Sequence, residues 1–128
     1  MITVSIIGLV LSALIGIMHF FVPIIFRWKM QLADKPKWLK VSIDWTNYFF
    51  SLLLSGSSII LLFFINDVFA KQTFALVLYG FMCFVWLNRV IVTILHHWKK
   101  GLLQLYYVAV FSVVFLLILI PFIRILLS

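Results

Sequence analysis

The chain has very few charged residues, and almost none of them are acidic. Only 10% of its 128 residues are charged, three of them Asp or Glu, while 66% are hydrophobic. The mean hydropathy is +1.29. A soluble domain of this length needs far more polar surface. The scarcity of charge therefore excludes an ordinary soluble domain and predicts one integral membrane domain over residues 1–128.

The chain also lacks the motifs that indicate common chemistries. Its single cysteine, Cys83, excludes an intramolecular disulfide. The sequence has no glycine-rich phosphate loop, no CxxC pair and no arrangement typical of a serine nucleophile. The net charge is +7, but no motif for RNA or DNA binding accompanies it, so nucleic acid is set aside as a partner. Whether the protein is an enzyme is left open.

Four long apolar segments are what the chain does have. A helix that crosses a bilayer needs about 20 mostly apolar residues, and four segments qualify, roughly 2–26, 41–65, 73–97 and 102–127. Their short connections make neighbours antiparallel. Continuous apolar runs of this length exclude a barrel. The sequence therefore predicts an all-α, up-down bundle of four transmembrane helices.

The basic residues are divided unequally between the two ends of these segments. The connection after the second segment and the C-terminal end carry only Lys71 and Arg124. Seven others lie in the first and third connections: Arg27, Lys29, Lys35, Lys37, Lys40, Lys99 and Lys100. Because cytoplasmic loops of membrane proteins carry the excess of Lys and Arg, we expect a cell-membrane protein with both termini outside.

Polar residues recur inside the apolar segments three or four positions apart, on one helix face. Gly8, Ser12 and Gly16 predict a packing face. The serines of the second segment are expected to bond to backbone carbonyls one turn earlier. Because alternate helices run in the same direction, the remaining polar residues fall in the cytoplasmic half, and the other half is expected to be almost entirely aliphatic and aromatic. The candidate site residues are His19, Asp44, Asn47, Arg89, Thr93, His96 and Gln104. They predict one polar cavity, open to the cytoplasm and closed below by apolar side chains.

Arg89 is the most costly of these residues. An arginine inside a membrane helix costs at least ~2.5–3.5 kcal/mol on insertion scales. Two interpretations are open: the side chain reaches up to the lipid headgroups, or it points into the bundle. We favour the second, with Asp44 as the expected ionic partner and Asn47 adding hydrogen bonds. Arg89 is then able to hold an anionic or carbonyl oxygen.

The histidines leave several interpretations open. His96 and His97 point about 100° apart on a helix, which disfavours a shared zinc ion. His19 and His96 are candidate haem ligands from opposite helices, although ordinary interfacial histidine is the favoured interpretation. His19 is also a candidate proton acceptor.

The segment GIMHFFVPIIF (Gly16–Phe26), followed by PKWL (Pro36–Leu39), resembles the DoxX-like small membrane proteins, which carry a G-x-x-H-F-x-x-P pattern late in helix one. LQLYYVAVF (Leu103–Phe111) resembles the start of their helix four. The acidic residue that family members place in helix two is missing here, where the chain reads LLLSGSSII. The resemblance implies a four-helix fold and a role beside membrane redox reactions or quinones.

The leading hypothesis is a binding or redox-accessory membrane protein that holds a small amphipathic ligand, quinone- or lipid-like. Three alternatives are open: a structural subunit of a larger membrane complex, a small haem protein, and a proton-coupled transporter acting as a homo-oligomer. The cofactor is unassigned, with haem and quinone as candidates. The lipid bilayer is the expected environment in each case.

Overall fold

Four long helices and two short ones make up the part of the protein that the structure describes. The computed structural model describes residues 1–96 and 100–128. Its short helices are α2 (Trp28–Gln31) and α4 (Ile65–Phe69). Its long helices are α1 (Ile2–Ile25), α3 (Lys37–Phe63), α5 (Thr73–Leu95) and α6 (Leu102–Leu127). Strands are absent from this part of the chain. The predicted all-α, four-helix architecture is confirmed.

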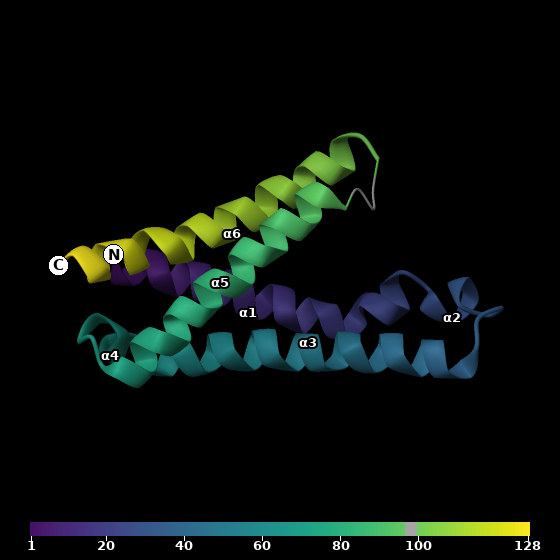
Figure 1. Ribbon diagram of the computed structural model, residues 1–128, viewed down its shortest axis with the longest axis horizontal. Coiled ribbons are helices and arrows are strands. Elements are labelled where there is room, and N and C mark those ends of the chain that lie inside the picture. Colours follow the sequence, from purple (N-terminus) through teal and green to yellow (C-terminus); the bar gives the residue numbers. More distant parts are fainter. Residues whose placement is uncertain (97–99) are drawn as a thin grey trace.

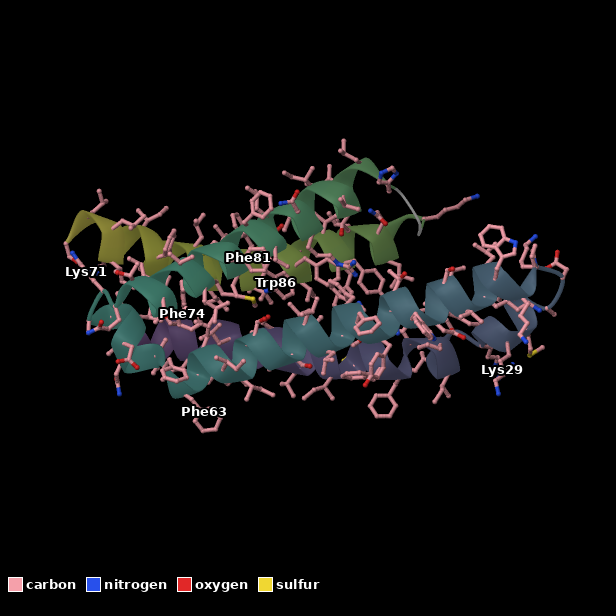
Figure 2. The ribbon with its side chains drawn as sticks, turned by 60° about the horizontal axis from the view of Figure 1, so that its bottom comes forward. Lys29, Phe63, Lys71, Phe74, Phe81 and Trp86 are labelled. Carbon is pink, nitrogen blue, oxygen red and sulfur yellow. The ribbon has the colours of Figure 1, made fainter. Side chains whose placement is uncertain are left out.

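The outer surface of these helices is apolar. Each of the four long helices has the length and hydropathy needed to cross a membrane. Large side chains such as Phe63, Phe74 and Phe81 point away from the bundle, whereas Trp86 points into it (Figure 2). Outward-facing aromatic and aliphatic side chains are stable against lipid and costly against water. The chain is therefore a multi-pass membrane protein.

Some helix ends differ from the predicted spans by a few residues. α3 begins at Lys37, directly after Pro36, and not near residue 41. Proline lacks the backbone N–H and suits a helix start, and the lysines at positions 37 and 40 lower the hydropathy of the first turn. α3 ends at Phe63, two residues early. α5 ends at Leu95, and His97, where this span was predicted to end, lies outside the described residues.

The helices form two pairs, α1 with α3 and α5 with α6, and α6 also packs on α1 (Figure 1). The pairs are close together at the end that holds both termini and α4. They diverge at the opposite end, where α2, the last turn of α5 and the first turn of α6 lie. We call this second end the basic end, because residues 27–40 carry five of the ten basic residues of the chain and Lys100 lies at the same end.

Small residues allow the close contact between α1 and α3. A Cβ atom on Gly16 would lie 2.6 Å from the backbone nitrogen of Ser55, which is closer than real Cβ atoms approach. Next to this contact, the hydroxyls of Ser51 and Ser55 donate to the carbonyls of Asn47 and Ser51, one turn earlier in α3. Neither hydroxyl therefore needs a hydrogen-bond acceptor on α1. The predicted packing face and serine back-bonding are both present.

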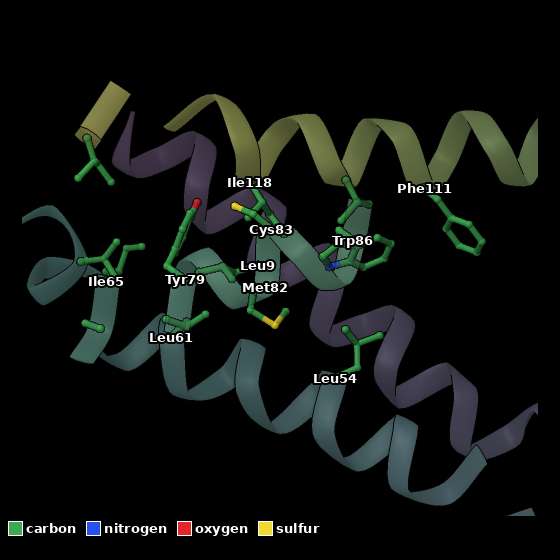
Figure 3. Packing of buried hydrophobic residues seen from close by; sticks show 14 residues of the cluster. Leu9, Leu54, Leu61, Ile65, Tyr79, Met82, Cys83, Trp86, Phe111 and Ile118 are labelled. Atoms are coloured by element: carbon green, nitrogen blue, oxygen red, sulfur yellow. The ribbon is translucent and has the colours of Figure 1, made fainter. Parts of the chain in front are cut away.

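The half of the bundle near the termini is not as apolar as predicted. Its core contains large apolar side chains (Figure 3), but Ser12 accepts hydrogen bonds from Ser58 (2.8 Å) and from the Trp86 indole (2.9 Å). Tyr79 donates to Ser5 at 3.0 Å. All five side chains are buried. The serine hydroxyls pair with the Trp86 indole and the Tyr79 hydroxyl here. This half was expected to be almost entirely aliphatic and aromatic, and these buried polar groups correct that expectation.

Candidate ligand-binding site around Arg89

A cavity of about 610 Å³ opens at the basic end, on the side where α5 diverges from α1 and α3. Five of the seven predicted site residues lie in its wall, and they come from three helices and the residue that follows α5. The lining consists of His19, Val22, Phe26, Trp28, Gln31, Asn47, Arg89, Val92, Thr93 and His96. The cavity therefore combines several polar groups with apolar and aromatic side chains, as ligand pockets generally do.

The Arg89 side chain points into the bundle and contacts three other helices. Its guanidinium carbon lies 4.7 Å from the ring centroid of Phe111 on α6 and 5.6 Å from that of Phe50 on α3. Its Nη2 lies 3.4 Å from Nε2 of His19 on α1. A cation over an aromatic face gains roughly 0.5–2 kcal/mol, depending on how far it is desolvated. The Arg89 side chain therefore points into the bundle and does not reach up to the lipid headgroups.

His19 is held as a neutral ring by its two contacts. Its Nδ1 lies 2.7 Å from the carbonyl oxygen of Ile15. A carbonyl oxygen only accepts, so the proton is on Nδ1. The guanidinium of Arg89 only donates, so the facing Nε2 carries the lone pair. His19 therefore brings an acceptor to Arg89, and the nitrogen that would bind a haem iron faces the arginine instead.

Asn47 replaces a hydrogen bond that the α1 helix loses. The carbonyl of His19 would normally accept the N–H of residue 23, but this residue is Pro23 and has no N–H. Asn47 on α3 donates its Nδ2 to this carbonyl at 2.7 Å. A side-chain amide inside the bundle thus satisfies a backbone group that would otherwise lack a partner. This hydrogen bond fixes the position of the Asn47 side chain relative to α1, next to the cavity.

Asp44 is not the partner of Arg89, and this prediction is wrong. Its side chain is exposed and lines clefts beside α1 and α2, with Pro23 and Lys40 among its neighbours. Within residues 1–96 and 100–128 the structure has one ion pair, Lys35 with Asp34 at 3.0 Å. Asp44 lies one turn nearer the basic end than Asn47, and α5 has diverged from α3 there. The carboxylate therefore has no facing helix that carries Arg89.

Gln104 lies beside the cavity without lining it. It is buried at the start of α6, and its Nε2 donates to the Thr93 carbonyl in the last turns of α5. Thr93 in turn donates its hydroxyl to the Arg89 carbonyl at 2.7 Å. Gln104 is therefore a link between α5 and α6, whereas His96 is exposed at the cavity wall.

Metal ligands do not gather here. Over the described residues, no group of three or more His, Cys, Asp or Glu side chains is close enough to hold a metal ion. The second histidine of the sequence pair, His97, lies outside that part of the chain.

No protein-family model, curated protein or solved structure matches the chain. Its function therefore has to be inferred from the cavity. The sequence interpretation missed the two rings that position Arg89, although a signal exists for both. Phe50 follows Asn47 by three residues and Phe111 follows Gln104 by seven, so each lies on the same helix face as a polar residue that the pattern had already singled out.

Proposed function

We propose that the protein is a multi-pass membrane protein that holds a small amphipathic ligand, quinone- or lipid-like, in the Arg89 cavity. One observation carries the proposal. The guanidinium lies in the wall of a cavity of about 610 Å³, and no carboxylate of the described residues pairs with it. Pockets of roughly 300–1,000 Å³ hold small organic ligands. An unpaired cation in such a cavity favours a ligand that brings oxygen atoms to it.

The lining suits a molecule with a polar head and an apolar tail. Arg89, with Asn47 and the neutral His19 beside it, contributes hydrogen-bonding groups at the inner wall. Val22, Phe26, Trp28 and Val92 are apolar or aromatic and favour a hydrocarbon tail. The resemblance of GIMHFFVPIIF to the DoxX-like proteins adds support for a role as an accessory of membrane redox reactions, and a quinone is the ligand class that this resemblance implies.

The direction of the protein in the membrane follows from its charge distribution. We place the basic end in the cytoplasm and both termini outside, because seven of the ten basic residues lie in its loops. The cavity then opens toward the cytoplasmic face. Cysteines introduced at Lys35 and Lys71 in a Cys83→Ala background test this direction. Labelling of position 71 from the cytoplasmic side would show that the protein has the opposite direction in the membrane.

Native mass spectrometry of the purified protein in a neutral detergent tests the function. We expect the wild type to carry one small amphiphile, and Arg89→Ala to lose it while keeping its helical content by circular dichroism. Asn88→Ala is the matched control, because Asn88 is the preceding residue but is exposed and donates to the carbonyl of Phe84 in its own helix. The control is expected to keep the ligand.

Two outcomes would contradict the proposal. A folded Arg89→Ala variant that retains the ligand at wild-type occupancy would show that the cavity is not the binding site. An empty cavity, together with a stoichiometric partner protein in the same preparation, would instead favour a structural subunit of a larger complex.

A further inference from the structure

No acidic residue of the chain neutralises Arg89. The sequence contains three acidic residues, and all three have other positions. Asp34 pairs with Lys35 in the loop after α2. Asp44 is exposed and lines two clefts together with residues of α1 and α2, and Arg89 lines neither of them. Asp67 lies in α4, at the opposite end of the bundle. The positive charge of Arg89 is therefore not balanced within the protein.

The contacts that Arg89 does make position the guanidinium without cancelling its charge. The rings of Phe50 and Phe111 hold it by cation–π contact. His19 is neutral by the contacts of its two nitrogens, so it offers a lone pair and no negative charge. Each neighbour comes from a different helix. The guanidinium is thus held at one point of the cavity wall, and a complementary charge has to come from a ligand.

The inner wall also has more donors than acceptors. A guanidinium has five N–H donors, and the structure describes one acceptor for them, Nε2 of His19. Asn47 uses one amide N–H for the His19 carbonyl, which leaves the second N–H as a donor and Oδ1 as an acceptor. The Thr93 hydroxyl is committed to the Arg89 carbonyl. A head group made only of acceptors, with two oxygens, matches this wall.

From this imbalance we infer that the head group of the ligand is a carboxylate, and that the cavity takes a single-chain fatty carboxylate. The inference rests on the proposed function, because it names the ligand class of the same cavity. A carboxylate carries one negative charge and matches the fork of one arginine bidentately. A phosphate monoester carries about −1.5 to −2 at neutral pH, which Arg89 alone does not balance. A quinone is neutral and leaves the charge of Arg89 uncancelled.

The test compares palmitic acid, its methyl ester and a short-tailed benzoquinone on the full chain in a nonionic detergent, corrected for partition into empty micelles. The acid and the ester share the same tail, so their difference reports the head group alone. We expect the acid to bind about ten-fold more tightly than the ester, or better, which is the usual gain from a hydrogen-bonded charge pair. Arg89→Gln is expected to reduce acid binding to the level of the ester and to leave ester binding unchanged. Arg124→Gln is the matched control, because Arg124 is exposed near the C-terminus, at the opposite end.

Each result decides the inference. Equal binding of acid and ester to the wild type overturns the assignment of the head group as a carboxylate. The proposed function survives this result if the two ligands bind at one molecule per chain. Binding of the quinone without the acid has the same meaning. If Arg89→Gln still prefers the acid, the preference arises from the basic loops and the inference is overturned. If none of the three binds, the proposed function fails together with the inference. If Arg89→Gln does not fold, the comparison on the wild type still decides.

Discussion

At the residue scale, the G-x-x-H-F-x-x-P segment has a physical explanation in this chain. Gly16 allows the backbone of α3 to approach α1. His19 faces Arg89 with its lone pair. Pro23 deprives the His19 carbonyl of its helical donor, and Asn47 supplies a donor from α3. The pattern thus joins three helices next to the cavity, so the polar wall of the site and the packing of α1 depend on the same residues.

The hydrogen bond from Asn47 to the His19 carbonyl is expected to stabilise the bundle. Asn47→Ala leaves a carbonyl inside the bundle without its donor, which costs about 1–3 kcal/mol. Pro23→Ala restores a backbone N–H at the position that can bond to this carbonyl. In the Pro23→Ala background the cost of Asn47→Ala should therefore be smaller. Unfolding of the four proteins of this double-mutant cycle in mixed micelles measures the difference.

Asn88→Ala serves again as the control, because the Asn88 amide bonds within its own helix on an exposed surface. Equal costs of Asn47→Ala with and without Pro23 would contradict the explanation of the segment.

The sequence indicated the polar residues of the site but not all of their partners. Arg89, His19 and Asn47 are conspicuous because polar groups inside apolar segments need partners, and their depth follows from the helical rise. The pairing of Arg89 with Asp44 was wrong, because depth along a helix does not tell how far apart two helices are at that depth. The divergence of α5 from α3 at the basic end is a property of the whole bundle.

At the element scale, α1 is the helix on which the others depend. Its small-residue face packs on α3. Gly8 brings α1 close to α6 as well, because a Cβ placed on Gly8 would lie 3.0 Å from Cγ1 of Ile118. The spacing of three and four residues predicted this buried face from the sequence. The hydrogen bonds of Ser12 with Ser58 and Trp86 join α1, α3 and α5. Local sequence patterns do not predict these bonds, because the bonded residues are separated by 46 and 74 positions in the chain.

The two glycines Gly16 and Gly56 provide a matched test of helix packing. A Cβ at position 16 meets the backbone of Ser55 at 2.6 Å, whereas a Cβ at position 56 meets nothing within 4 Å. Gly16→Ala should therefore separate α1 from α3 and destabilise the bundle by about 1–3 kcal/mol, the usual cost of overpacking. Gly56→Ala should be neutral or slightly stabilising, because alanine favours the helix.

Thermal unfolding of both variants in the same detergent measures these two effects. A Gly16→Ala variant as stable as Gly56→Ala would contradict the close contact of the two helices.

At the scale of the whole molecule, the bundle is closed at one end and open at the other. The four spans and their up-down order follow from hydropathy and short loops, so the sequence predicted them well. The splaying of the two helix pairs could not be predicted, because it depends on the sum of contacts between helices distant in sequence. This opening is what brings His19, Asn47 and Arg89 to the wall of one cavity.

The most direct test of the account is to find where a bound amphiphile touches the protein. A single-chain amphiphile with a diazirine next to its head-group oxygens can be cross-linked to the protein in membranes and mapped by peptide mass spectrometry. We expect adducts in residues 19–31 and 89–96, which form most of the cavity wall, and their loss in Arg89→Ala. Adducts spread over outward-facing residues such as Phe63 and Phe81, unchanged by Arg89→Ala, would contradict the existence of a binding site at Arg89.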